Sequence, residues 1–252
     1  MIDVHCHLHD VVFDKDRDEV VERAKKRGLK FIITAVIRPE EVSKALKVFR
    51  RYGGFVQLTI GHDPVLVDKE VFEKQIENTR KNVDLIVGIG EVGLDYWYVR
   101  DHEARKLQEK FFIEWIEFSR TYNLPLVIHS RSAGKYAIKV LLENKFYNVI
   151  MHAYDGSVGY AMEAAKYGVM FSIPPSVIYS VQKQKLVKKL SLENLLLETD
   201  SPVLAPIKGE RNEPSNIIYS AKKIAEIKGV SLEKVIEITT ENALKVFKRL
   251  RK

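Results

Sequence analysis

The sequence is poor in cysteine, glycine and proline, with 1, 13 and 8 of these among its 252 residues. The lone cysteine, Cys6, has no second thiol with which to form an intramolecular disulfide. So little glycine and proline excludes a collagen-like chain, and 46% hydrophobic residues exclude a mainly disordered one. The composition therefore indicates a globular protein with a buried core and no disulfide scaffold.

Long hydrophobic runs are absent as well. The longest stretch without Asp, Glu, Lys or Arg covers residues 167–182, and Gly168, Pro174 and Pro175 within it make it a poor membrane-spanning helix. The first residues lack the basic and apolar regions of a signal peptide. We therefore expect no membrane segment, and the single cysteine favours the reducing cytoplasm.

The net charge is modest, since 41 Lys and Arg against 34 Asp and Glu give +7 at pH 7. A charge of this size is typical of a well-solvated surface. A polyanionic partner such as nucleic acid would account for it too. Charge alone favours the solvated surface.

Eight short runs of apolar, often β-branched residues recur along the chain at fairly even intervals. Because the runs are almost continuously apolar rather than alternating, they indicate buried parallel strands. The runs cover residues 2–7, 31–36, 55–60, 85–90, 125–129, 149–152, 169–173 and 195–199.

Charged amphipathic stretches separate these runs and indicate helices. The clearest covers residues 101–122, where apolar side chains recur at steps of three and four. The other predicted helices cover residues 40–51, 69–82, 134–145, 160–167, 215–228 and 231–250. Eight strands alternating with helices predict an α/β fold, a (β/α)8 TIM-type barrel with residues 1–252 as a single domain. A doubly wound open sheet is the alternative, but it usually has fewer strands, and no G-x-G-x-x-G motif follows the first run.

Six potential metal ligands fall where the predicted strands end. In a barrel the carboxyl ends of the strands form the active-site face, so side chains at these positions converge. Singly, each histidine of the later strands fits a hydrogen-bonded core residue, and the glutamate fits a buried ion pair. Together the six side chains favour a metal centre. They are His5, His7, Glu91, His129, His152 and Asp200.

The pattern His5-Cys6-His7 suits chelation of one ion. Alternate residues of a strand point to the same face, so both imidazoles can reach the ion while Cys6 points toward the helix layer. A lone H-x-H is often accidental. At the end of the first strand, with four further ligands at later strand ends, it becomes a specific signal.

The two carboxylates suit different tasks. Glu91 follows an apolar run, and its two oxygens can bridge two ions about 3.5–4 Å apart. Asp200 can bind an ion and also accept a proton from an activated water. Glu198 lies two residues earlier on the same strand face and is predicted to support the site from behind. Asp95 is predicted to order its loop rather than to act in catalysis.

Five segments of the sequence resemble the TatD-type metal-dependent deoxyribonucleases of the amidohydrolase superfamily. The matches occur in the family's order and span essentially the whole chain. They are IDVHCHLHD at 2–10, GIGEVGLDYW at 88–97, PLVIHSR at 125–131, LLLETDSP at 195–202 and RNEP at 211–214. The resemblance implies a (β/α)8 barrel with two metal ions that hydrolyses phosphodiester bonds, typically in DNA.

The resemblance also implies how the ligands divide between the two ions. One ion would be held by His5, His7 and Asp200, the other by His129 and His152, with Glu91 between them. A hydroxide shared by the ions would attack phosphorus, and Asp200 would take or shuttle the proton. Imidazole ligands favour Zn²⁺, Mn²⁺ or Ni²⁺ over Mg²⁺, and the identity of the metal stays open.

Four further residues are candidates for binding a DNA substrate. Arg131 lies two residues beyond a predicted ligand, and its planar guanidinium suits bidentate contact with phosphate. Lys208 and Arg211 lie on a glycine-containing loop, where a solvated charge run explains them equally well. Tyr154 and the aromatic residues 96–98 follow strand ends, where they would stack on unpaired bases or pack at the rim.

Two other functions remain open. An amidohydrolase that cleaves a small amide, ester or lactone would use the same centre, because fold does not fix substrate. A non-catalytic nucleic-acid-binding protein with a structural metal site is less favoured, because six such ligands around two ions leave room for water. Many relatives in that superfamily carry a modified lysine on the fourth strand, so Glu91 at that position favours the TatD type.

Overall fold

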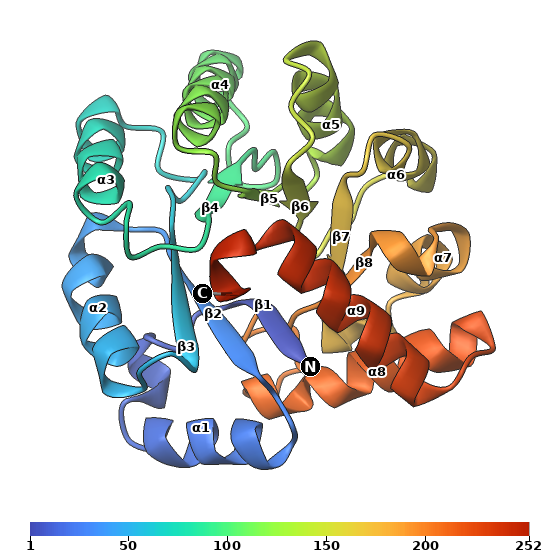
Figure 1. The fold of residues 1–252 in the computed structure, drawn as a ribbon. Helices are drawn as coiled ribbons and strands as arrows, with labels where there is room; N and C mark the ends of the chain where they lie inside the picture. Colours follow the sequence, from blue (N-terminus) through green and yellow to red (C-terminus); the bar gives the residue numbers. More distant parts are fainter. Residues whose placement is uncertain (252) are drawn as a thin grey trace.

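The computed structural model describes residues 1–251 and forms a barrel of eight parallel strands surrounded by helices (Figure 1). The strands are β1 (Ile2–Cys6), β2 (Phe31–Val36), β3 (Val56–Ile60), β4 (Ile89–Gly93), β5 (Leu126–His129), β6 (Val149–Met151), β7 (Met170–Ile173) and β8 (Leu195–Leu197). The helices are α1 (Arg17–Lys26), α2 (Val42–Arg51), α3 (Lys69–Lys81), α4 (His102–Tyr122), α5 (Gly134–Glu143), α6 (Val158–Ala165), α7 (Val181–Lys189), α8 (Ile217–Lys228) and α9 (Leu232–Val246).

The strands follow one another around the barrel in sequence order. Parallel pairing joins β1 to β3 in one run and β4 to β8 in another. A parallel bridge between Thr59 and Gly88 connects the two runs. The ring closes where Asp200 N donates to His5 O at 2.9 Å, just beyond the end of β8. The predicted (β/α)8 barrel is therefore confirmed.

Two local predictions differ from the structure. The fourth strand covers Ile89–Gly93 rather than residues 85–90, because the apolar run begins beside a turn, where Leu85 is 39% exposed. Glu91 consequently lies within the strand and not after its end. The periodicity also did not single out α1 and α7, since each buries only three side chains among many charged ones.

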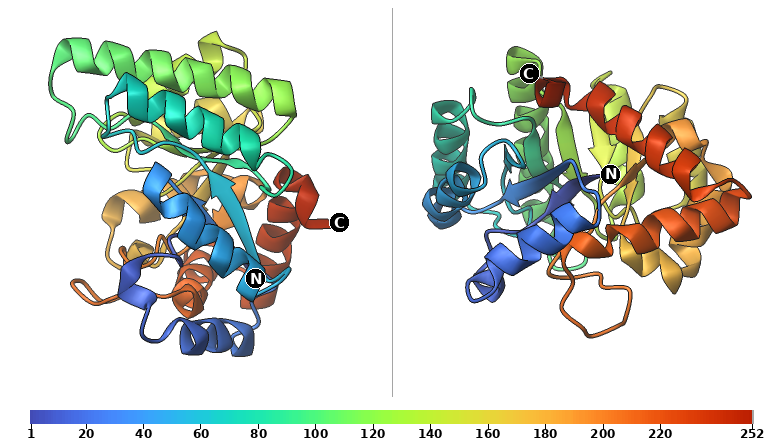
Figure 2. Two further views of the ribbon diagram at one scale, coloured as in Figure 1. Left: turned by 90° about the vertical axis from the view of Figure 1, so that its left-hand side faces the viewer. Right: turned by 60° about the horizontal axis from the view of Figure 1, so that its bottom comes forward.

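One end of the barrel is closed by apolar packing. Ile2, Val4 and Leu196 inside the barrel form one cluster with Ala243 of α9 and with Phe247, which follows that helix. Figure 1 shows α9, in red, across the end of the barrel at which β1 begins. The right-hand view of Figure 2 shows the long connection between β8 and α8 projecting from the other side. The carboxyl ends of the strands therefore open away from α9.

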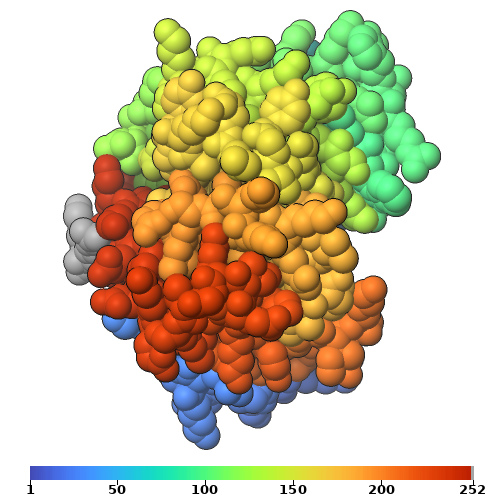
Figure 3. All heavy atoms as spheres, turned by 90° about the vertical axis from the view of Figure 1, so that its right-hand side faces the viewer, coloured from blue at the N-terminus to red at the C-terminus, as the bar shows by residue number. Residues whose placement is uncertain are grey.

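The helices form an outer layer around the strands. Figure 3 shows α6, α7 and α8 packed side by side on one face of the molecule, in yellow to orange-red. Cys6 is fully buried and belongs to the apolar cluster that includes Val20 and Ala24 of α1. Among residues 1–251, no helix combines the length and the apolar character needed to cross a membrane.

A buried carboxylate links the first strand to the segment after the last one. Asp3 in β1 is fully buried, and its Oδ1 accepts a hydrogen bond from Thr199 N at 2.9 Å. Its Oδ2 accepts a second bond from Thr199 Oγ1 at 2.5 Å. Because Thr199 directly precedes Asp200, this link also fixes a strand end that carries a predicted metal ligand.

Replacing this carboxylate should destabilise the barrel. Asp3→Ala leaves the buried N–H of Thr199 without an acceptor and leaves the Thr199 hydroxyl only Ser201 Oγ, at 3.0 Å, so we expect the free energy of unfolding to fall by about 1–3 kcal/mol. Denaturant titration of both proteins measures the change. Thr199→Val keeps the backbone N–H bond to Asp3 and should lose less. Equal unfolding midpoints for Asp3→Ala and the natural chain would contradict the assignment.

Candidate metal centre

Five strands bring the six predicted ligands together at the open end of the barrel. His5 and Glu91 lie within β1 and β4, and His129 ends β5. His7, His152 and Asp200 follow β1, β6 and β8 within three residues of the last strand residue. The sequence pattern therefore leads to one contiguous cluster, although its first and last members, His5 and Asp200, lie far apart in the 252-residue chain.

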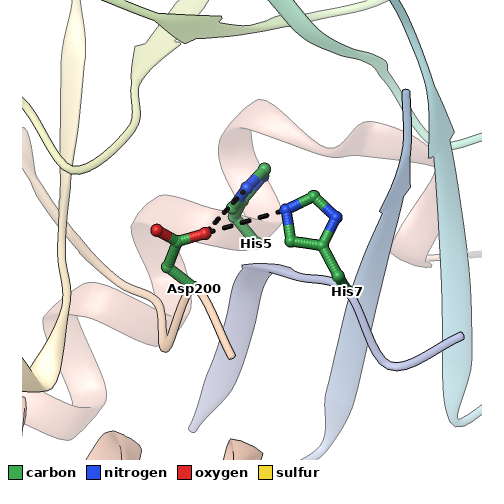
Figure 4. A group of neighbouring side chains, drawn as sticks. All are labelled: His5, His7 and Asp200. Atoms are coloured by element: carbon green, nitrogen blue, oxygen red, sulfur yellow. Dashed lines mark ion pairs between the residues drawn. The ribbon is translucent and has the colours of Figure 1, made fainter. Parts of the chain in front are cut away.

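The first group of ligands consists of His5, His7 and Asp200. His5 Nε2 lies 3.4 Å from Asp200 Oδ1, and His7 Nε2 lies 3.8 Å from the same oxygen (Figure 4). One ligand atom from each residue lies within 4.8 Å of the other two. This spacing is compatible with a single ion between the three side chains.

The second group is centred on Glu91. Its Oε2 lies 3.1 Å from His5 Nε2 and 2.9 Å from His152 Nε2. Its Oε1 lies 3.7 Å from His129 Nδ1. His5, Glu91 and His152 again offer ligand atoms within 4.8 Å of one another. Since both carboxylate oxygens face imidazoles, Glu91 occupies the centre of the cluster.

Local irregularities of the backbone orient the side chains of His5 and Glu91. The parallel pairing of β1 shifts between Asp3 and Cys6, and that of β4 shifts between Gly90 and Val92, so His5 and Glu91 each lie at an irregular position. Such irregularities turn a side chain out of the regular strand alternation. Regular alternation alone would not direct both side chains to the same point.

Close approach of backbones and unusual dihedral angles also mark this end of the barrel. Gly93 has φ of +135°, and a Cβ built there would lie 2.2 Å from His129 O, so only glycine lets β4 approach β5 this closely. Asp200 and Ala153 have φ of +53° and +41°, in the left-handed region that non-glycine residues seldom adopt. Residues held in this way concentrate at functional sites, where surrounding contacts maintain them.

Three of the four imidazoles, those of His7, His129 and His152, face a polar group with the nitrogen that points away from the cluster. His129 Nε2 lies 2.9 Å from Asp95 Oδ2, and His7 Nδ1 lies 3.0 Å from the carbonyl oxygen of Ala35. His152 Nδ1 lies 3.6 Å from Glu198 Oε2. Such partners fix ring orientation and direct the other nitrogen toward an ion.

Two carboxylates outside the ligand set therefore have defined tasks. Asp95 orders its loop, because its Oδ1 accepts bonds from the backbone N–H groups of Trp97 and Tyr98 at 2.9 and 2.8 Å. Its other oxygen faces His129, a role that its loop position alone did not reveal. Glu198, which is fully buried, accepts bonds from Ala153 N at 2.7 Å and from Ser172 Oγ at 2.6 Å.

Several buried polar atoms of the cluster lie near oppositely charged groups but form no hydrogen bond of good geometry among the described residues. They include both ring nitrogens of His5, Oε2 of Glu91 and Nδ1 of His152. A buried polar atom without a partner costs about 1–3 kcal/mol, so native proteins seldom retain several together without a function. Nitrogen and oxygen donors that face one point are the ligands of divalent transition metals, so the residues fit such ions.

The electrostatics of the cluster favour bound cations. Burial opposes ionisation of Glu91, but the opposing charge of His152 outweighs it and lowers the pKa of Glu91 well below its usual value. Burial and the charge of His152 likewise oppose protonation of His5, yet the adjacent carboxylates of Asp200 and Glu91 raise the pKa of His5 to about 9. Burial lowers the pKa of His7. The carboxylates thus remain ionised and attract positive charge, whether protons or metal ions.

A pocket of about 370 Å³ opens beside the cluster. Three predicted ligands form part of its wall, together with two cationic side chains and a short apolar segment. The lining residues are His129, Ser130, Arg131, His152, Ala153, Asp155, Lys183, Asp200, Val203 and Leu204. A volume of this size is in the range of small-ligand sites.

The four candidates for substrate binding occupy different positions. Arg131 is exposed at the pocket, and its guanidinium carbon lies 5.3 and 5.1 Å from the ring centroids of Trp97 and Tyr98. Lys208 is exposed over the ring of Tyr179, with Nζ 4.8 Å from the centroid, and is not a lining residue.

The other two candidates lie away from the pocket. Arg211 is engaged by Asp16, with an Nη2–Oδ2 distance of 2.5 Å. Tyr154 is 1% exposed, its hydroxyl donates to Ser157 O at 3.0 Å, and its ring packs against Phe171. These contacts leave neither side chain free at the pocket wall, because an ion pair holds the first and the core encloses the second.

Sequence reasoning missed Lys183, which lines the pocket although it lies in the charged helix α7. Lys183 shares the buried face of that helix with Leu186 and Val187. The spacing of three and four residues from these apolar positions was the available signal. Lysine is usually solvated, so the signal is weak without a tertiary structure.

Comparisons with known proteins identify the family of the chain. Residues 2–248 match the family model described as TatD related DNase. The human protein named Deoxyribonuclease TATDN3 is 43% identical over an alignment that covers 100% of this chain and 96% of that protein. An uncharacterized metal-dependent hydrolase of Methanocaldococcus jannaschii is 37% identical, covering 98% of this chain and 97% of that protein.

Solved structures share the fold. YJJV, a TatD homolog from Escherichia coli, is 21% identical and superposes with a TM-score of 0.88 over 98% of both chains. A hydrolase of the TatD family from Entamoeba histolytica is 23% identical, with a TM-score of 0.86 over 98% of this chain and 97% of that one. The family model spans nearly the whole chain, and the chain therefore belongs to the TatD related DNase family.

Proposed function

We propose that the chain is a metal-dependent hydrolase that cleaves phosphodiester bonds in DNA with two divalent ions per chain. The observation that carries this proposal is the Glu91 carboxylate, whose two oxygens face imidazoles from three other strands. A carboxylate in this position can serve two ions at once. The named relatives, a deoxyribonuclease and a metal-dependent hydrolase, support the same class of reaction.

The six ligands would divide between the two ions. His5, His7 and Asp200 would hold one ion, and His129 and His152 would hold the other. Glu91 would contact both. The donor set contains four nitrogens and favours Zn²⁺, Mn²⁺ or Ni²⁺ over Mg²⁺. Divalent ions at these positions would supply Lewis acidity for activating water and for neutralising charge on the phosphoryl oxygens.

The chain's own residues have separate tasks in this reaction. Asp200 faces His5 and His7 through Oδ1, which would accept the proton released by the attacking water. Asp95 and Glu198 hold the imidazoles of His129 and His152 in orientation. These contacts are present before substrate binds, so little reorganisation accompanies the reaction.

Arg131 is the proposed phosphate contact at the pocket mouth. Its guanidinium lies against two exposed aromatic rings, Trp97 and Tyr98, which limits its motion while its N–H groups stay available. The same two rings offer flat apolar faces for a nucleobase. A phosphodiester with an attached base therefore matches the chemistry of this rim.

Two further properties belong to the proposal. We propose that residues 1–252 act as one hydrolase domain, since all the described strands contribute to one barrel with one ligand cluster. We propose the reducing cytoplasm as its location, because the only cysteine is buried and unpaired.

A direct assay tests the function. The purified chain, loaded in turn with Zn²⁺, Mn²⁺, Ni²⁺ or Mg²⁺, is offered labelled single- and double-stranded DNA beside a panel of small amides, esters and lactones. We expect metal-dependent cleavage of DNA. Turnover of the small substrates without cleavage of DNA would instead establish the amidohydrolase alternative. An absence of turnover with every metal would favour the non-catalytic nucleic-acid-binding alternative.

Removing the charge of the central carboxylate should prevent the chain from binding two ions tightly. Glu91→Gln keeps the size of the side chain but loses its charge, so we expect fewer than two tightly held ions and loss of most activity. Elemental analysis after gel filtration measures the ions, and circular dichroism checks the fold. The exposed Glu73→Gln on α3 is the matched control. Two tightly held ions in Glu91→Gln would refute the bridging role.

Neutralising the proton acceptor should affect turnover more than packing. Asp200→Asn retains a carbonyl oxygen but cannot take a proton near neutral pH, so we expect kcat with saturating metal to fall about 10²–10⁴-fold. Melting temperature and the ion at His129 and His152 should persist. A variant within about threefold of the natural enzyme would show that another group, such as Glu198, accepts the proton.

Truncating the phosphate contact should act on substrate binding. Arg131→Ala removes a charge-assisted hydrogen bond, so we expect KM for DNA to rise by the equivalent of about 1.5–3 kcal/mol with metal content unchanged. The control is Lys139→Ala, an exposed cation on the outer side of α5. An unchanged KM would mean that Arg131 has only a structural role at the rim.

A further inference from the structure

Lys183 is a buried cation that the mechanism above does not use. Its side chain belongs to α7, and the residue is only 7% exposed. Its Nζ donates to Ala153 O at 2.8 Å and to Tyr154 O at 3.5 Å. Within residues 1–251, no carboxylate lies close enough to form an ion pair with it. Taking a charge out of water without a counter-charge is costly, so its retention requires an explanation.

Donating hydrogen bonds to two backbone carbonyl oxygens does not by itself require a charged side chain. Gln184 on the same helix donates from its neutral amide to Val177 O and Ile178 O, both at 2.9 Å. Gln182 donates to Gly156 O at 2.8 Å in the same way. The helix thus uses amides for carbonyl contacts elsewhere. What distinguishes Lys183 is its positive charge.

The position of this charge connects it to the substrate pocket. Lys183 and Arg131 both line the pocket, and Asp200 and His152 of the ligand cluster line it too. An ammonium has three N–H donors, and the two carbonyl contacts occupy two of them. Burial lowers the pKa of Lys183, and Glu198, Asp155 and Asp200 oppose that shift only through their longer-range charges. An anion in the pocket would supply the counter-charge that direct contacts lack.

We propose that Lys183 and Arg131 form a phosphate subsite on the wall of the pocket, with Lys183 as its fixed inner cation and Arg131 as its outer one. The ligand is a phosphate group of the substrate strand, or the phosphate of the product before release. This inference rests on the proposed phosphodiester substrate. It assigns a substrate-binding role to α7, a helix that carries none of the metal ligands.

The main competitor is a purely structural role. In that case Lys183 would only donate hydrogen bonds to the carbonyl oxygens of Ala153 and Tyr154 and thereby hold His152 in place. Lys183→Gln separates the two roles, because an amide can still donate to these carbonyls but carries no charge. Lys183→Met removes both the donors and the charge. The control is Lys185→Gln, an exposed lysine two residues along the same helix.

Binding of inorganic phosphate by calorimetry is the primary measurement, with metal content and melting temperature determined on the same samples. We expect Lys183→Gln to keep both its ions and its melting temperature while its affinity for phosphate falls about tenfold. The slope of log K against log salt for a short single-stranded oligonucleotide should become shallower by about 1. Lys185→Gln should change neither the phosphate affinity nor the metal content.

Two outcomes would overturn the subsite. Unchanged phosphate affinity and salt slope in Lys183→Gln would show that its charge does not meet the ligand. Equal loss of metal in Lys183→Gln and Lys183→Met would show that the lysine only holds the segment that carries His152. Because phosphate binding is measured without turnover, a chain that fails to cleave DNA would refute the proposed function while the subsite is still judged on its own result.

Discussion

The structure depends above all on the desolvation of one carboxylate. Glu91 lies inside the barrel rim, where an ionised side chain is stable only if surrounding groups replace the lost water. Imidazoles from β1, β5 and the end of β6 do so at 2.9–3.7 Å. The imidazoles of His129 and His152 must in turn be held, and this requirement accounts for the buried positions of Asp95 and Glu198. The positions of the surrounding imidazoles, and of the carboxylates behind them, thus depend on the buried charge of Glu91.

The two ends of the barrel divide stability and function between them. At the closed end, α9 and Phe247 cover an apolar interior without buried charge in that cluster. The open end contains residues with positive φ such as Asp200, irregular strand pairing, and buried polar atoms without hydrogen bonds. Such features destabilise a fold, and the apolar end offsets them. This division is characteristic of barrel enzymes, whose catalytic groups lie at the carboxyl ends of strands.

The pocket carries different charges at the ligand cluster and on its wall. Ionised carboxylates and imidazoles form its inner part, while Lys183 and Arg131 place positive charge on its wall. Exposed Trp97 and Tyr98 extend the wall with flat apolar surface. A ligand that carries both phosphate and base matches this sequence of environments better than a neutral amide does. Membership of the family indicates the chemistry, and we propose that these wall residues select the substrate.

The sequence by itself determined the strand number, the barrel and the meeting of the six proposed metal ligands, because apolar runs mark buried strands and side chains at strand ends meet at one rim. Only the tertiary structure decided what surrounds those ligands. Residues 85–88 were wrongly assigned to the fourth strand because an apolar run does not distinguish a strand from the irregular segment that leads into it. The second role of Asp95, the burial of Lys183 and Tyr154 and the engagement of Arg211 all arise from segments far apart in sequence. Among these side chains only Lys183 has a periodic signal, and it is weak, since contacts across the barrel rim depend on how loops close in three dimensions.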